Sequence, residues 1–247
     1  MGREVLWFVF RKMTNISEVA VLWFDRNFLY LCVKIFIMAD NYLGKKMEDH
    51  QRAAAPARRT SRTLLQLLER NRSHRAFDPS FRVREDQLHR IVEVATKVPS
   101  ARNQQVLRFR MVLADEAAKV LPHIRLGGAL PELHLPVEGT EPNAFIIICS
   151  TAAVSHYVSV DLGIVAQSML LQAVEIGLNG ICIGAFDAKA VSEAFDLRYE
   201  PVLILAIGRG ADKIRLTEIG EEEDHRYYRE DGIHYVPKVR VEDLILK

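Results

Sequence analysis

The sequence predicts an α/β or α+β domain built around a sheet of about four strands. Residues 144–150 (AFIIICS) and 201–208 (PVLILAIG) are continuous apolar runs, the pattern of strands buried on both faces. Residues 106–113 instead alternate apolar side chains with Arg108 and Arg110, which is typical of a strand with one face on the core. A long apolar helix is expected between the two buried runs, so strands and helices alternate along the chain.

The composition of the 247 residues is that of an ordinary soluble globular protein, with 49% hydrophobic and 26% charged residues. The net charge of +1 gives no reason to expect a nucleic-acid partner. The eight histidines show no metal-ligand spacing, so no metal site is expected. Of the three cysteines (Cys32, Cys149 and Cys182), the last two lie in apolar runs, which predicts buried thiols in a reducing, cytoplasmic compartment.

Residues 1–60 differ in character from the rest and are expected to be an N-terminal extension and linker before a folded domain at 61–247. Residues 20–38 have about the length of a membrane span, but three charges argue against one, so no stable span is expected. Two alternatives stay open. The segment forms an amphipathic helix on a membrane or on the protein itself, or it precedes a natural start at Met38 or Met47.

Two amphipathic helices are expected at the start of the folded domain. The first carries four leucines between Leu64 and Leu68 and ends in a polar string. The second begins with the acids of residues 84–86 and stops at Pro99. A short helix over 115–121 is followed by residues 122–143, whose glycines and prolines predict an irregular segment, either a functional lid or disordered.

The longest helix is predicted between Ser155 and Ile176. Apolar residues surround most of it, which indicates burial on more than one side, in a core or at a subunit interface. Gly177 and Gly180 are expected to end it, because glycine tolerates the left-handed conformation that follows many helices. A short strand at 181–183 then leads to Gly184, whose unshielded amide suits a flat ligand, although any packed turn looks the same.

The C-terminal region is predicted to hold a helix over 189–195 and then the second buried strand. After that strand a loop is expected over 209–220, followed by a solvated acidic run. Residues 232–247 are expected to form an extended arm, kept open by Pro237, for which no partner within the chain is obvious.

Two polar strings stand out against this apolar scaffold. Arg72-Ser73-His74-Arg75 offers guanidinium and hydroxyl groups that suit a phosphate, or else a basic helix end that complements its own dipole. Ser100-Ala101-Arg102-Asn103-Gln104-Gln105 gathers amides that could bind the edge of a heterocycle, or else is simply a polar loop. Nucleotide-binding glycine motifs and the Gly-x-Ser-x-Gly elbow do not occur.

Together and in this order, these strings resemble the nitroreductase family of flavin mononucleotide (FMN) enzymes. Residues 72–77 (RSHRAF) are similar to the family's Arg-Ser-x-Arg-x-Phe opening, and residues 99–105 (PSARNQQ) to its Pro-Ser-Ala-x-Asn-x-Gln loop. Residues 161–173 look like its central helix, and residues 183–186 (IGAF) like the strand turn beneath the flavin. Many relatives carry two successive arginines where this chain has Asn71-Arg72.

The resemblance implies an α+β fold with a central, mostly antiparallel sheet flanked by helices, in an intertwined homodimer whose C-terminal arms exchange. It implies FMN in a cleft at the dimer interface. The implied cofactor-binding residues are Arg72, Ser73, His74 and Arg75 at the phosphate, ribityl chain and ring edge, Ser100, Ala101, Asn103 and Gln105 along the ring, Ile183, Gly184 and Ala185 at the redox-active edge, and Arg209 as a further phosphate contact.

The implied activity is a ping-pong reduction of nitroaromatics, quinones or similar small-molecule acceptors, in which NADH or NADPH delivers hydride to flavin N5. Hydride transfer requires no side-chain acid or base, so no catalytic residue is assigned. Alternatives remain open: a protein that binds FMN without turnover, a flavin-fragmenting or dehalogenating enzyme on the same fold, or a flavin-free structural protein.

Overall fold

The computed structural model describes residues 62–128 and 135–246, and residues 62–247 form one compact unit. The expectations for residues 1–60 and for Cys32 lie outside the described residues, as does the segment 129–134 of the irregular stretch.

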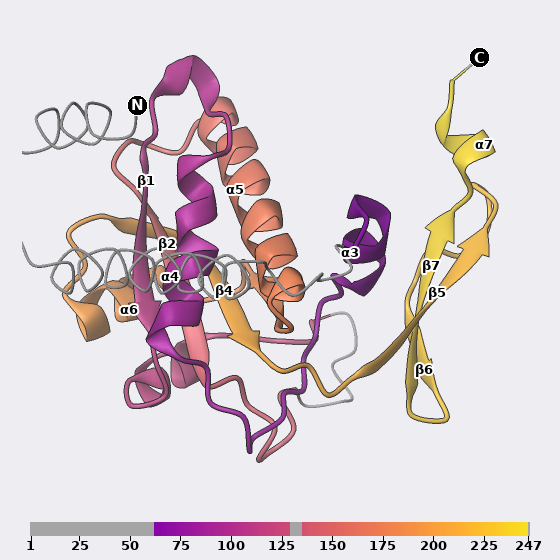
Figure 1. Ribbon diagram of the computed structural model, residues 1–247, viewed down its shortest axis with the longest axis horizontal. Coiled ribbons are helices and arrows are strands. Elements are labelled where there is room, and N and C mark those ends of the chain that lie inside the picture. The colour runs from indigo at the N-terminus through magenta and orange to yellow at the C-terminus, as the bar shows by residue number, and fades with distance from the viewer. Residues whose placement is uncertain (1–61, 129–134, 247) are drawn as a thin grey trace, which may run out of the picture. The chain divides into compact units, whose positions relative to one another are not determined.

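A four-stranded antiparallel sheet forms the centre of this unit (Figure 1). Its strands are β1 (Leu107–Val112), β2 (Ala144–Ser150), β3 (Asn179–Ile183) and β4 (Glu200–Gly208), in the order β1-β2-β4-β3. The two continuous apolar runs became the two central strands, β2 and β4, and every residue of β2 is buried. The prediction of a mostly antiparallel α+β sheet is therefore confirmed.

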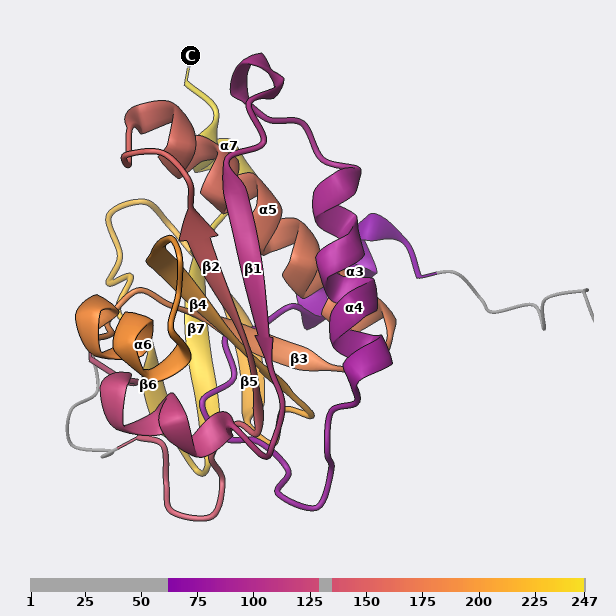
Figure 2. The ribbon, with the colours of Figure 1, turned by 90° about the vertical axis from the view of Figure 1, so that its left-hand side faces the viewer.

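Each face of the sheet packs against its own set of helices, because successive side chains of a strand point to opposite faces. Ile146, Ile148 and Leu205 share a core with α4 (Glu85–Glu93) and α5 (His156–Glu175). Ile147 and Ile204 share a second core with α6 (Ala188–Phe195) and two short 3₁₀ turns, η3 (Ala117–Lys119) and η4 (Leu121–His123). Figure 2 shows α4 and α5 on one side of the sheet and α6 on the other. The predicted single helix at 115–121 is thus two 3₁₀ turns instead.

Helix α5 is the longest described helix and confirms the prediction for residues 155–176. The Ser155 hydroxyl caps its start by accepting a hydrogen bond from the Val158 amide at 3.4 Å, and Gly177 follows its end at φ +84°. Its sides differ: Met169 and seven further residues are buried, whereas Tyr157 stays 61% exposed. By length and composition it is the one described helix that could span a membrane, a test that the core helix of a soluble protein also passes.

Gly180 differs from its prediction. It has no positive φ and lies inside β3, where a Cβ would stand 2.6 Å from the carbonyl oxygen of Ala206. Glycine is needed here for the close approach of two strands, whereas Gly177 supplies the turn.

Cys149 is buried as predicted, and burial raises the pKa of its thiol to about 11. Cys182 is exposed, contrary to the prediction, because β3 is an edge strand and Cys182 points away from the side that buries Ile181 and Ile183.

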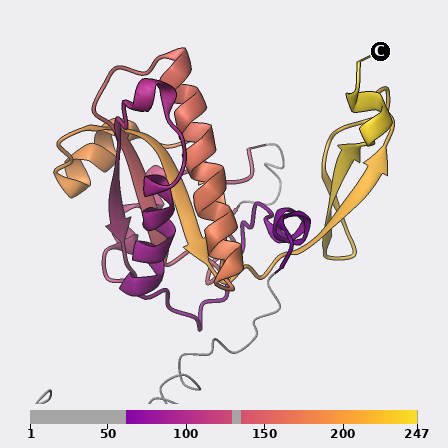
Figure 3. The same cartoon turned by 45° about the horizontal axis from the view of Figure 1, so that its top comes forward.

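The C-terminal region contains a second sheet, which overturns two expectations. Residues 209–220 are not a loop, because they contain β5 (Lys213–Ile219). The C-terminal arm does have a partner within the chain: β7 (Ile233–Val239) pairs in parallel with β5 and antiparallel with β6 (Tyr228–Glu230), and the short helix α7 (Val241–Leu244) follows. Figure 3 shows this sheet standing apart from the four-stranded one.

Pro237 is compatible with this pairing for a local reason. Strand β6 covers β7 only from Ile233 to Tyr235, so Pro237 has a neighbouring strand on one side, where it lies opposite Thr217. A proline has no amide proton to give to a second neighbour. Pro237, which had suggested an extended arm without a partner, therefore lies in the part of β7 that forms an edge of the sheet.

Candidate functional site

The first polar string lies along the edge of the four-stranded sheet. It follows α3 (Leu64–Arg70), whose start is fixed by reciprocal hydrogen bonds between Thr63 and Gln66. Ser73 then forms a parallel bridge with Gly180 of β3, and the His74 amide donates to the Gly180 carbonyl at 3.2 Å. The close approach that Gly180 permits thus places the string beside the edge strand.

The arginines of this string keep unused hydrogen-bond donors. Arg72 donates from one terminal nitrogen to the Leu68 carbonyl at 2.6 Å, as expected for a basic residue at the end of a helix. Arg75 donates to the Ser73 carbonyl at 3.1 Å and its guanidinium lies 5.3 Å from the centre of the Tyr227 ring. The Nε atoms of both arginines are buried without a partner among the described residues. Burial also lowers the pKa of Arg72.

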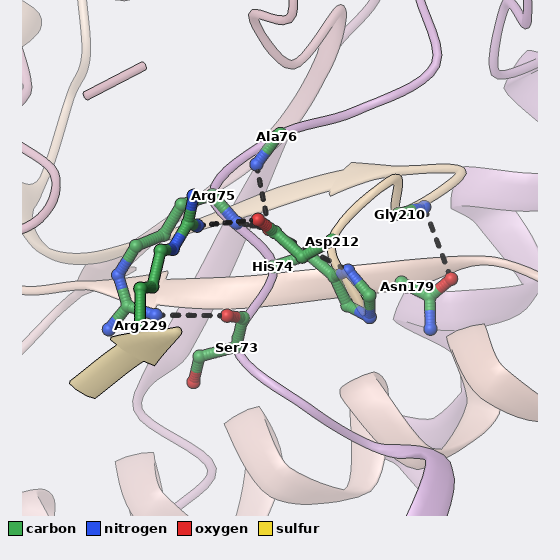
Figure 4. Close-up of polar contacts among 8 residues, drawn as sticks. All are labelled: Ser73, His74, Arg75, Ala76, Asn179, Gly210, Asp212 and Arg229. Carbon is green, nitrogen blue, oxygen red and sulfur yellow. Dashed lines mark hydrogen bonds and ion pairs between the residues drawn. The ribbon is translucent and has the colours of Figure 1, made fainter. Parts of the chain in front are cut away.

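A buried carboxylate that the sequence did not reveal holds this string in place (Figure 4). One oxygen of Asp212 accepts from the amides of Arg75, at 2.6 Å, and Ala76, at 2.9 Å. The other accepts from the Arg229 guanidinium at 2.7 Å. Asp212 lies just before β5, in residues that had been predicted to be a loop.

Two buried histidines flank the same carboxylate. The Nδ1 atom of His74 is 3.9 Å from Asp212 Oδ2, and neither this atom nor Nδ1 of His234 has a hydrogen-bond partner in the described part of the chain. Burial lowers the pKa of both histidines, Arg75 acts in the same direction on each, and Asp212 opposes the shift. A Cβ on Gly210 would overlap the His74 ring, so this glycine makes room for it.

The second polar string is held by another buried acid. The Ala101 amide, in the 3₁₀ turn η2 (Ala101–Asn103), donates to both oxygens of Asp161 in α5, at 2.9 and 3.1 Å. Within the string, Gln105 Nε2 donates to Asn103 Oδ1 at 3.0 Å, and the Gln105 amide donates to the Ser100 hydroxyl at 3.3 Å.

The backbone of this loop is strained. Arg102, Asn103 and Gln105 have φ values of 52°, 54° and 48°, a region that residues other than glycine seldom adopt. Such strain persists where surrounding contacts impose it, and it is concentrated at functional sites. A pocket of about 180 Å³ opens beside the loop, lined among others by Ser100, Gln105 and Asp161. Typical small-molecule pockets exceed about 300 Å³, so this one is part of a site at most.

The other predicted residues occupy separate positions. Ile183 is buried at the end of β3, whereas Gly184 and Ala185 are exposed, with open space where a Cβ of Gly184 would stand. The Ala185 carbonyl accepts from the Arg125 amide at 2.8 Å. The guanidinium of Arg209 contacts other groups: it lies 3.6 Å from the Asp78 carboxylate and 4.2 Å from the centre of the Phe81 ring.

The two polar strings meet the same helix. Asn71 donates to Gln167 of α5 at 3.3 Å, and Ala101 donates to Asp161, six residues earlier. At 1.5 Å per residue these anchor points are about 9 Å apart along the axis. Gly180 and Gly184 are separated by about 13 Å of extended strand. Both strings therefore lie against α5, and the first string also lies beside β3.

A model of the nitroreductase family matches residues 68–133 and 139–209, which include all the predicted site residues. The chain belongs to the nitroreductase family. A Bacillus subtilis (strain 168) protein, YdgI, named as an NAD(P)H nitroreductase, is 25% identical over 186 residues, which cover 60% of this chain and 89% of that protein. Together these findings support an oxidoreductase.

Solved structures of the family agree with this fold. A nitroreductase family protein from Streptococcus pneumoniae TIGR4 superimposes with a TM-score of 0.53 at 18% identity, covering 75% of this chain and all of that one. A nitroreductase-type protein from Exiguobacterium sibiricum 255-15, solved in complex with FMN, has a TM-score of 0.51 at 21% identity and covers 62% of this chain and 90% of that one. The predicted nitroreductase-like fold is confirmed.

Proposed function

We propose that this member of the family is an FMN-dependent oxidoreductase that takes electrons from NADH or NADPH and reduces small acceptors such as quinones or nitroaromatics. The observation that carries the proposal is a pair of buried Nε donors, on Arg72 and Arg75 beside the edge of β3, that have no partner within the described part of the chain. A buried donor without a partner is costly, so such groups indicate a missing acceptor. The family match and the FMN complex of a relative support FMN as this acceptor.

The chemistry of these donors suits a flavin phosphate and ring edge. Guanidinium groups bind phosphate oxygens through charge-assisted hydrogen bonds. Arg72 and Ser73 would hold the phosphate and the ribityl chain, with His74 packed behind them, and Arg75 would lie at the ring edge. Arg209 is the weakest of the assigned contacts, because its guanidinium lies against Asp78 and Phe81 and would have to turn to reach a phosphate.

The second string would line the flavin ring. Asp161 holds the Ala101 amide, and the left-handed residues present the side chains of Asn103 and Gln105 from an exposed loop. These amides and the Ser100 hydroxyl would bind the ring's polar edge. At the far end of β3, Ile183 would pack below the ring, and the bare backbone of Gly184 and Ala185 would let it approach closely.

When bound, FMN supplies the redox chemistry by accepting a hydride at N5 and passing electrons to the acceptor. The chain's own contribution is position and charge. A guanidinium at Arg75 would stabilise negative charge near the ring's N1 and O2 positions. Of the described residues, 122–128, 135–143 and 212–230 would shape the acceptor pocket, and a donor and an acceptor that use this pocket in turn would give ping-pong kinetics.

The proposed site is completed by a second copy of the chain. The pocket beside Gln105 is smaller than a ligand site, and apolar side chains are exposed around α5 and α7. They include Val154, Tyr157, Val160, Val241, Leu244, Ile245 and Leu246. We propose a homodimer in which these surfaces are covered, with the whole β5-β7-β6 sheet as the arm that reaches the partner. Val160→Asp should then shift the protein to monomers in sedimentation measurements, and an unchanged dimer would exclude this surface.

Two variants test the cofactor assignment. Arg72→Ala and Arg75→Ala should each lower FMN occupancy, and the double variant should lose FMN. Full occupancy in the double variant would refute the assignment.

Steady-state oxidation of NADH or NADPH with a quinone as acceptor should give the parallel double-reciprocal lines of a ping-pong reaction. An FMN-loaded protein without turnover would favour a binding protein, or a flavin-fragmenting or dehalogenating enzyme. Within the proposal the protein acts in the cytoplasm, as a domain beginning near residue 61.

A further inference from the structure

The C-terminal sheet is joined to the first polar string through Asp212 (Figure 4). The Asp212 side chain is 5% exposed, and three donors converge on it: the Arg75 amide, the Ala76 amide and the Arg229 guanidinium. The neighbouring Ala211 amide also donates to the Ala76 carbonyl at 2.9 Å. Asp212 lies directly before β5, and Arg229 lies in β6. One oxygen of the carboxylate therefore binds the string, and the other binds the C-terminal sheet.

The side chain of Arg75 is held by the same region. Its guanidinium lies 5.3 Å from the centre of the Tyr227 ring, which precedes β6 and contacts His234 of β7, with 5.0 Å between the ring centres. A cation above an aromatic face is held there electrostatically. Residues 211–234 therefore hold the main chain of Arg75, and Tyr227 together with the Ser73 carbonyl holds its guanidinium.

Asp212 binds the main chain of Arg75 and not its guanidinium. A carboxylate paired with the guanidinium would neutralise it and compete with an anionic ligand. Here the amide is bound instead, and the Nε of Arg75 has no partner among residues 62–128 and 135–246. One carboxylate among the guanidinium groups of Arg72, Arg75 and Arg229 also leaves the cluster positively charged. The arrangement orients a cation without cancelling its charge.

We propose that Asp212 is a positioning residue that holds Arg75 against the flavin, so that the C-terminal sheet sets the reduction potential of the bound cofactor. This inference rests on the proposed function. A guanidinium held near the ring stabilises the reduced, anionic form and raises the potential. When Asp212 is removed, Arg75 loses its fixed place and the potential falls.

The experiment compares Asp212→Ala, Asp212→Asn, Arg75→Ala and the double variant Asp212→Ala/Arg75→Ala with the unmodified protein. Asp115→Ala is the control, because Asp115 is an exposed aspartate outside the segments assigned to the site. The readouts are the flavin midpoint potential, the Kd for FMN, and hydrogen exchange of the Arg75 and Ala76 amides in the flavin-free protein.

Asp212→Ala should shift the potential to more negative values and raise the Kd for FMN about tenfold, the effect of losing one charge-assisted hydrogen bond. Asp212→Asn keeps an acceptor oxygen, so its shift should be smaller. In the Arg75→Ala background, removing Asp212 should shift the potential no further, because two residues that act through one group are not additive. Exchange of the two amides should accelerate without flavin, and Asp115→Ala should match the unmodified protein.

An unchanged potential in Asp212→Ala, or an equal shift with and without Arg75, would overturn the positioning role while leaving the proposed function intact. Unchanged amide exchange would overturn it independently of any flavin. If Asp212→Ala does not fold, Asp212→Asn carries the same comparison. An unmodified protein that binds no FMN would instead refute the proposed function, and this inference with it.

Discussion

The Asp161 carboxylate in α5 receives the Ala101 amide on both of its oxygens, at 2.9 and 3.1 Å, while its side chain is almost fully buried. A buried acid in an otherwise apolar helix is costly unless it is paired. Here it anchors the strained loop that carries Ser100, Asn103 and Gln105. This contact joins the longest helix of the fold to the proposed flavin site.

Removing this anchor should destabilise the loop. Asp161→Ala leaves the Ala101 amide without its acceptor, and the free energy of unfolding should fall by about 1–3 kcal/mol. Asp161→Asn keeps one acceptor oxygen and should lose less. Urea unfolding measures both. Asp115→Ala, at an exposed aspartate, should change little, and an Asp161→Ala protein as stable as this control would contradict the anchoring role.

Much of this architecture follows from local sequence patterns. The apolar runs at 144–150 and 201–208 have the length and composition of buried strands, and the helix around Met169 was long and apolar enough to be recognised. The β5–β7 pairing was missed because it is non-local. β6 lies between the two strands in sequence, and no residue near Lys213 shows which strand β5 pairs with. A short alternation of Ile214 and Leu216 with polar residues was the available signal.

The candidate site residues were chosen from their charge and from the family resemblance, and their role at a flavin stays a prediction. Arg72 and Arg75 stand out in sequence, and the structure places them beside β3. Asp212 could not be found in this way, because its partners are the amides of Arg75 and Ala76, which lie 137 and 136 positions earlier in the sequence. Asp161 was recognisable as an acid within an apolar helix, whose other acid, Glu175, is its last residue, although the partner of Asp161 was not.

Gly210 should not tolerate a larger residue. A Cβ there would overlap the His74 ring, whereas Gly128 has nothing within 4 Å of the same position. Gly210→Ala should therefore lower the free energy of unfolding by about 1–3 kcal/mol, and Gly128→Ala should not. Thermal or urea unfolding tests both variants. Combining Gly210→Ala with His74→Ala should restore part of the loss, and no restoration would place the strain elsewhere.

Acid should destabilise the protein through its buried histidines. Burial lowers the folded-state pKa of His74 and His234 below the ordinary value of 6.5. The unfolded chain therefore takes up protons as the pH falls through 6.5, before the folded chain does. Stability is greatest above that pH and declines below it. For His74 the neighbouring Arg72 and Arg75 add to the shift, and Asp212 opposes it.

Unfolding free energies at about pH 8 and about pH 5.5 measure this decline. His74→Gln should reduce the difference between the two values, because glutamine does not titrate. His89→Gln, at an exposed histidine, should leave the difference as it is. A decline of equal size in His74→Gln and in the unmodified protein would rule out His74 as its source.

Arg72 should discriminate FMN from riboflavin. Its unpartnered Nε and its position beside Ser73 assign it to the phosphate, which riboflavin lacks. Arg72→Ala should raise the Kd for FMN by about 10- to 100-fold, the range of charge-assisted hydrogen bonds. The Kd for riboflavin should barely change. Fluorescence quenching of the two flavins measures both constants, and equal weakening would mean that Arg72 supports the fold and not the phosphate.

The visible absorption spectrum of the purified protein, recorded before and after anaerobic addition of NADPH or NADH, tests the central claim most directly. The proposed function predicts a flavin spectrum that bleaches on reduction and recovers when a quinone or nitroaromatic is added. A bound flavin that stays oxidised would contradict the reductase activity. No bound flavin, even after incubation with FMN, would contradict the assignment of the site itself.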